Sequence, residues 1–82
     1  MAGAVIQSGV EIGPNAIINT GVSVDHDCII GKNSHISPGS IICGETKIGD
    51  DCFIGAGSVI VNNIEIKSGS VIKAGQIITK SI

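Results

Sequence analysis

The sequence predicts an all-β solenoid, a chain of short strands wound into stacked coils, and three observations lead to that prediction. First, the 82 residues include 18 Ile and 7 Val but no Leu and only 5 Ala, a composition that favours strands over helices. Second, an apolar β-branched residue recurs at every sixth position without a slip. Third, residues that tolerate a positive φ angle recur with the same period.

The inner wall of the solenoid is predicted from two columns of the six-residue repeat. The 13 positions spaced by six from Ile6 to Ile78 are all Ile except Val24. Two residues before each of these positions from Ile12 onward, and again four residues after Ile78, lies a mostly small side chain. Both columns point inward because side chains alternate faces along a strand. The second inward column consists of Val10, Ala16, Val22, Cys28, Ser34, Ser40, Thr46, Cys52, Ser58, Ile64, Ser70, Gln76 and Ile82.

The corners between the strands are predicted from a third column. All of its members except Glu45 and Ser81 are Gly, Asn or Asp, which adopt a positive φ angle more readily than other amino acids. We therefore expect a turn in every hexad, with one short strand between successive turns. The column consists of Gly9, Asn15, Gly21, Asp27, Asn33, Gly39, Glu45, Asp51, Gly57, Asn63, Gly69, Gly75 and Ser81.

A six-residue repeat with one turn in each unit resembles the left-handed parallel β-helix of the hexapeptide-repeat acyltransferases, in which three hexads form one triangular coil. The resemblance implies a single-stranded β-helix of a little over four coils over residues 1–82, about 20 Å tall at ~4.8 Å per coil. It also implies a homotrimer with active sites between adjacent subunits. Solenoid ends normally need caps, so we expect the chain either to be part of a longer protein or to depend on oligomerisation.

The composition also excludes several function classes. With no Arg, Trp or Tyr, one Phe and five scattered Lys, the chain offers no stacking platform or basic patch for nucleic acid. No apolar run approaches the ~20 residues that span a bilayer. The three cysteines form no C-x-x-C pair, so we expect reduced thiols in a cytoplasmic protein, with Cys28 and Cys52 in the core and Cys43 facing outward.

The two histidines of the chain lie in hexads that depart from the repeat. His26 lies at a predicted corner between two carboxylates, in the run Val24-Asp25-His26-Asp27-Cys28, and neighbouring carboxylates can orient the ring of a catalytic base. His35 is predicted to point outward from a strand.

Steps of one coil, which is three hexads, add two further expectations. Gly44 should lie directly above His26, leaving open space and a bare backbone N–H beside the ring. Ala56 and Ala74 should stack above Thr20 and Pro38 as a column of small residues that can floor a groove for an extended ligand.

Beyond the repeat pattern, one run of residues resembles a particular group of enzymes within that fold. The run from Asn19 to Ile60, NTGVSVDHDCIIGKNSHISPGSIICGETKIGDDCFIGAGSVI, is similar to the C-terminal domain of sugar acetyltransferases that modify bacterial sialic acid or UDP-amino sugars. The resemblance implies transfer of an acetyl group from acetyl-CoA to a sugar hydroxyl or amine, without a metal. It implies that the N-terminal nucleotide-sugar-binding domain of those relatives is absent from residues 1–82.

The same resemblance implies roles for individual residues. His26 corresponds to the general base, and Asp27 to the carboxylate that supports it. The residues that correspond to acetyl-CoA contacts are His35, Gly44, Ala56 and Ala74.

Two other functions stay open on the sequence alone. A non-catalytic structural solenoid would favour an outward row of one residue type, and the outward columns here are mixed. A zinc enzyme similar to the γ-carbonic anhydrases would need three histidines around the metal, and this chain has two.

Overall fold

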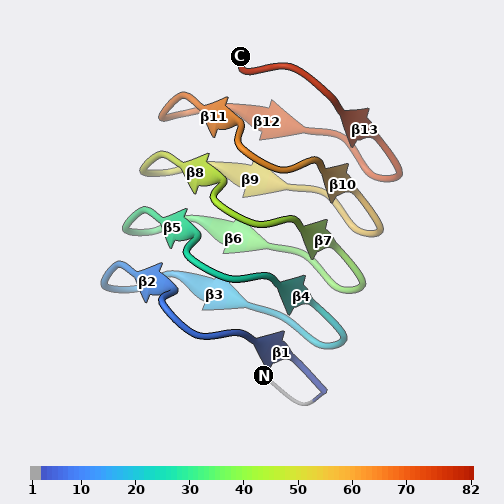
Figure 1. The fold of residues 1–82 in the computed structure, drawn as a ribbon. Coiled ribbons are helices and arrows are strands. Elements are labelled where there is room, and N and C mark those ends of the chain that lie inside the picture. Colours follow the sequence, from blue (N-terminus) through green and yellow to red (C-terminus); the bar gives the residue numbers. More distant parts are fainter. Residues whose placement is uncertain (1–2) are drawn as a thin grey trace.

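The computed structural model describes residues 3–82, which form thirteen two-residue strands joined by turns (Figure 1). The strands are β1 (Val5–Ile6), β2 (Glu11–Ile12), β3 (Ile17–Ile18), β4 (Ser23–Val24), β5 (Ile29–Ile30), β6 (His35–Ile36), β7 (Ile41–Ile42), β8 (Lys47–Ile48), β9 (Phe53–Ile54), β10 (Val59–Ile60), β11 (Glu65–Ile66), β12 (Val71–Ile72) and β13 (Ile77–Ile78). Within residues 3–82 there is no helix long and apolar enough to cross a bilayer.

The strands form three parallel sheets, which are the three faces of a prism (Figure 1). Face A contains β1, β4, β7, β10 and β13, face B contains β2, β5, β8 and β11, and face C contains β3, β6, β9 and β12. Each strand pairs in register with the equivalent strand of the next coil, as His35 does with Phe53. The chain makes a little over four coils and forms the left-handed β-helix expected from the sequence (Figure 1).

The two predicted inward columns form the core. Ile36, Ile42 and Ile60 are fully buried, as are their equivalents in the middle coils. Cys28 and Cys52 are buried in the second column, which confirms their predicted place, and all three cysteines are free thiols. In the first coil Ile6 and Ile12 are more than a third exposed, because the described residues place no coil beneath them.

The buried hydroxyls of the core connect each coil to the next. Ser40 Oγ donates to the carbonyl of Gly55 at 3.0 Å and Thr46 Oγ1 donates to the carbonyl of Val61 at 3.0 Å. Equivalent hydrogen bonds link Ser34 to Gly49 and Ser58 to Lys73. Among residues 3–82 every buried side-chain nitrogen or oxygen has a partner, so the polar column adds hydrogen bonds without unpaired groups.

The predicted corner residues have positive φ angles from Gly9 to Gly75, including Glu45 at 60°. Ser81 differs and does not adopt this conformation. Its hydroxyl accepts a hydrogen bond from the Glu65 N–H at 2.8 Å, and the Ile82 carbonyl accepts one from the Lys67 N–H. The Ser81 hydroxyl thus takes the place of the backbone carbonyl that accepts the equivalent hydrogen bond in the other coils. Ile82, which was predicted to point inward, is about half exposed.

Candidate functional site

The structure divides the predicted site residues between two edges of the prism. Corner AB, which joins face A to face B, carries His26, Asp27 and Gly44. Corner CA, which joins face C to face A, carries Ala56 and Ala74. His35 lies on β6 of face C, the strand that leads into corner CA. The outer surface of face A separates the two groups within one chain.

At corner AB the His26 ring is held by its neighbours in the chain. His26 Nδ1 lies 3.3 Å from Asp27 Oδ2, and both side chains are more than half exposed. The Asp25 carboxylate accepts a hydrogen bond from the His26 backbone N–H at 2.8 Å, which orders the turn. If Nδ1 carries the hydrogen and donates to Asp27, then Nε2 has the free lone pair that a base requires.

The edge of the His26 ring that carries Nε2 faces Gly44 in the next coil. A Cβ atom at Gly44 would lie 2.8 Å from Nε2 and 2.9 Å from Cε1 of His26. The stacking of Gly44 above His26 is therefore confirmed, and the space expected to be open is partly filled by the ring itself. The backbone hydrogen bond from the Glu45 N–H to the His26 carbonyl, 3.0 Å, holds the two coils at this spacing.

The second residue after a strand, where it is not proline, has an N–H that the sheet ladders do not use. At Thr20, His26, Lys32 and Asp50 a side chain accepts this hydrogen, as Asn19 does for Thr20. Within residues 3–82 the N–H groups of Gly44, Ala56 and Ala74 donate to no protein group. These three residues can therefore each offer a backbone donor to a bound molecule.

His35 packs against an aromatic ring of the next coil rather than against the other site residues. Its ring centroid lies 5.3 Å from that of Phe53, with the two rings tilted by 42°. His35 is half-buried, and the outward column of face C also contains Ile17 and Val71. The stacking of Phe53 above His35 fixes the imidazole on this face, close to the start of corner CA.

The outward surface of face A, between the two groups, is largely apolar. Its column contains Val5, Ser23, Ile41, Val59 and Ile77. Val5, Ile41 and Ile77 are each about half exposed or more. The corresponding column of face B is mostly charged, with Glu11, Lys47 and Glu65. Covering face A would therefore remove apolar side chains from water, which is favourable.

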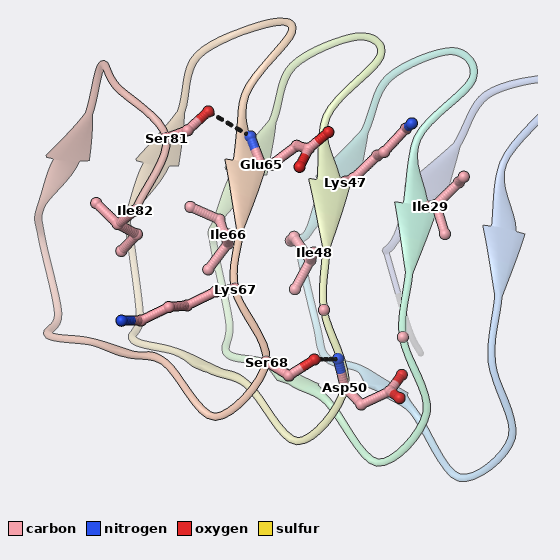
Figure 2. Close-up of a pocket in the computed structure, with 12 residues that line it drawn as sticks. Ile29, Lys47, Ile48, Asp50, Glu65, Ile66, Lys67, Ser68, Ser81 and Ile82 are labelled. Carbon is pink, nitrogen blue, oxygen red and sulfur yellow. Dashed lines mark hydrogen bonds between the residues drawn. The ribbon is translucent and has the colours of Figure 1, made fainter.

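A hollow of about 500 Å³ lies on face B and includes none of the predicted site residues (Figure 2). Its lining includes Lys47, Glu65 and Lys67, together with Ile82 of the final segment. Figure 2 shows the Ser68 hydroxyl bound to the Asp50 N–H at its edge. Its lining contains carboxylates, lysines and serine hydroxyls but no histidine or thiol.

The arrangement of potential metal ligands bears on the zinc alternative. In the part of the chain that the structure describes, no three His, Cys, Asp or Glu side chains are grouped so that they could hold one metal ion. His26 and His35 lie on a corner and on a face that do not adjoin. The residues present therefore do not fit a three-histidine zinc site.

Family comparisons agree with this architecture. Residues 11–44 match the family described as "Bacterial transferase hexapeptide (six repeats)" and residues 45–80 match "Hexapeptide repeat of succinyl-transferase". Both descriptions are of hexapeptide-repeat transferases, and the chain belongs to this hexapeptide-repeat group. A search of curated proteins found no significant match.

Solved structures place it beside particular acetyltransferases. The acetyltransferase domain of PglB from Neisseria gonorrhoeae FA1090 is 39% identical and superimposes with a TM-score of 0.99; the match covers 100% of this chain and 40% of that one. That domain has also been solved with acetyl coenzyme A, at a TM-score of 0.98. Serine acetyltransferase of N. gonorrhoeae is 28% identical, with a TM-score of 0.85 and coverage of 90% and 34%.

A more distant structure shares the fold alone. Perosamine N-acetyltransferase from Caulobacter crescentus is 18% identical with a TM-score of 0.77, and the match covers 98% of this chain and 47% of that one. This chain therefore spans less than half the length of the solved chains that it resembles.

Proposed function

We propose that this chain is an acetyltransferase domain that transfers an acetyl group from acetyl-CoA to a hydroxyl or amine of a sugar. The observation that carries the proposal is the His26–Asp27 pair, held at a corner with Nε2 over the backbone of Gly44. The similarity to the acetyltransferase domain of PglB, which has been solved with acetyl coenzyme A, supports the choice of co-substrate.

In this proposal His26 acts as the general base. Nε2 accepts a proton from the sugar hydroxyl or amine as that group attacks the thioester carbon, which contributes about 10²–10⁴ in rate for a well-placed base. The C–S bond then breaks, and the proton passes to the departing sulfur, which leaves as the thiol of coenzyme A. Asp27 accepts the Nδ1 hydrogen bond, so it keeps the lone pair on Nε2 and the ring in one orientation. Asp25 fixes the backbone of the same turn through the His26 N–H.

Acetyl-CoA supplies an activated acetyl thioester. The backbone N–H groups of Gly44, Ala56 and Ala74, which have no protein partner within residues 3–82, can donate hydrogen bonds to it. The Gly44 N–H, beside the His26 ring, is placed to donate to the thioester oxygen, a contact that stabilises developing negative charge. Ala56 and Ala74 offer N–H groups along a smooth corner, where the amides of an extended pantetheine chain can bind. His35 lies at the start of this corner and is the further coenzyme contact.

The separation of the two groups by face A favours a site that a second copy of the chain completes. A coenzyme bound along Ala56 and Ala74 of one subunit can reach the His26 of a neighbour if the apolar face A is covered by packing side by side. We therefore propose a homotrimer with active sites between adjacent subunits. The acceptor is a sialic acid or a UDP-linked amino sugar, and the three free thiols suit a reducing, cytoplasmic setting.

The direct test replaces His26 by Ala in the full-length protein and measures release of coenzyme A with UDP-amino-sugar and sialic acid acceptors. We expect kcat to fall about 100-fold or more, because the proton acceptor is lost. Lys32→Ala is the matched control, because Lys32 is exposed and occupies the equivalent position, second after its strand, at the next corner. A His26→Ala protein with the circular dichroism spectrum and the activity of the unmodified protein would contradict the proposal.

A further inference from the structure

The Asp27 carboxylate lies over Gly9 in the coil below. A Cβ atom at Gly9 would fall on Asp27 Oδ1 and would come within 3.0 Å of Asp27 Cγ. The backbone sets this stacking, since the Asp27 N–H donates to the Ser8 carbonyl at 3.1 Å. The carboxylate thus occupies the space that any side chain at position 9 would need.

The positive φ angle of Gly9, 77°, favours glycine but does not by itself exclude a side chain at this corner. Corner residues with side chains have φ angles of 56° to 62°. Asn15, Asn33 and Asp51 stack above one another in three successive coils with φ angles of 62°, 60° and 56°. A stack of side chains is therefore compatible with this fold, and at Gly9 the Asp27 carboxylate fills the space that a side chain would occupy.

Two glycines from neighbouring coils thus enclose the histidine–aspartate pair. Gly44 leaves room above for the His26 ring, and Gly9 leaves room below for the Asp27 carboxylate. We infer that Gly9 is a positioning residue for the acetyl-transfer site, which acts by holding Asp27 where it can accept the Nδ1 hydrogen of His26. The expected change in kcat rests on the proposed function. The expected change in the His26 tautomer rests on the geometry alone.

Gly9→Asn tests this inference, because Asn keeps the turn and adds a side chain. Gly69→Asn is the matched control: Gly69 has a φ angle of 80°, and a Cβ atom there would meet nothing within 4 Å. The first readout is the ¹⁵N spectrum of the neutral His26 ring. We expect a protonated Nδ1 in the unmodified protein and a shift toward the Nε2–H form in Gly9→Asn alone.

His35 is an internal reference for that spectrum, because it lies on face C away from Gly9. Its ring resonances should be the same in all three proteins. An unchanged His26 tautomer in Gly9→Asn would overturn the inference, whatever the enzyme assay shows. This readout is independent of the proposed function.

The second readout is kinetic. We expect Gly9→Asn to lower kcat by about 3- to 30-fold, a part of the 10²–10⁴ supplied by a positioned base, with the KM for acetyl-CoA unchanged. In the Asp27→Asn background the same change should have no further effect, because the group it positions is gone. Additive losses in the double variant would contradict a role through Asp27. Full activity in His26→Ala would instead refute the proposed function and leave the spectral result standing.

Discussion

At the scale of single residues, the chemistry depends on which side chains are absent. The His26 ring can lie against the next coil only because Gly44 has no side chain there. The N–H of the same residue is left without a protein partner within residues 3–82. In the proposed mechanism Gly44 therefore provides both room for the His26 ring and a backbone N–H for the substrate.

Gly44→Ala is expected to disable the site without unfolding the chain. Its backbone is not in the left-handed region, so the added methyl group is not strained by the turn, and it would displace the exposed His26 ring. We predict a loss of kcat of about 10- to 100-fold, within the contribution of a general base. The melting temperature should stay within a few degrees of that of the unmodified protein. Unchanged kinetics would show that the ring does not need its present position.

The three thiols should differ in reactivity. Burial raises the pKa of the Cys28 thiol above its usual range, so it stays protonated at neutral pH, and the thiol donates to the Cys43 carbonyl at 3.0 Å. We predict that an alkylating reagent modifies the partly exposed Cys43 in the native protein, whereas Cys28 and Cys52 react only after unfolding. Peptide mass spectrometry gives the modified positions. Early labelling of Cys28 would contradict the packing of the core.

At the scale of elements, each strand is short and the corners carry much of the specificity. Alternation of side chains and a turn in every hexad are local properties, so all thirteen strands followed from the periodicity of the sequence. The prediction was wrong at Ser81 and Ile82, where a side-chain hydroxyl enters the ladder. The six-residue period does not reveal where a side-chain hydroxyl accepts a hydrogen bond in place of a backbone carbonyl.

Glycines that directly follow a strand should be essential for stacking. A Cβ atom at Gly31 would lie 2.5 Å from both the carbonyl carbon and the oxygen of Gly49, and a backbone cannot move aside as a side chain can. We predict that Gly31→Ala lowers the free energy of unfolding by about 1–3 kcal/mol, as overpacking does. Urea denaturation measures this, and Gly44→Ala is the control. Equal stability of the two variants would contradict the distinction.

At the scale of the whole molecule, the candidate site is distributed over two edges of one prism. His26, Asp27 and Gly44 lie at corner AB and Ala56 and Ala74 lie at corner CA, with apolar face A between them. If adjacent subunits complete one another's sites, then two different inactive variants can restore activity when they are mixed.

Subunit mixing tests this arrangement. His26→Ala and Ala56→Trp should each be inactive alone, the first for lack of a base and the second because the indole blocks the coenzyme. Co-refolded in equal amounts, they should regain about a quarter of the unmodified activity, since a random mixture pairs an intact His26 with an intact Ala56 in that share of sites. Light scattering should give a trimer in each case. An inactive mixture of properly formed trimers would mean that one chain supplies both groups.

The sequence by itself determined the fold, the inward and outward faces and the stacking of Gly44 on His26, because all of these follow from the alternation along a strand, the hexad and the coil of three hexads. Only the tertiary structure decided how the His26 and Asp27 side chains lean. One turns up against Gly44 and the other down over Gly9, so that two coils beyond their own shape the pair. Side-chain orientation depends on the free space left by neighbouring coils, and a repeat pattern does not describe that space. The structure likewise places Ala56 and Ala74 across face A from His26, while Gly44 lies beside the ring, and the proposal of a site completed by a second subunit rests on that separation.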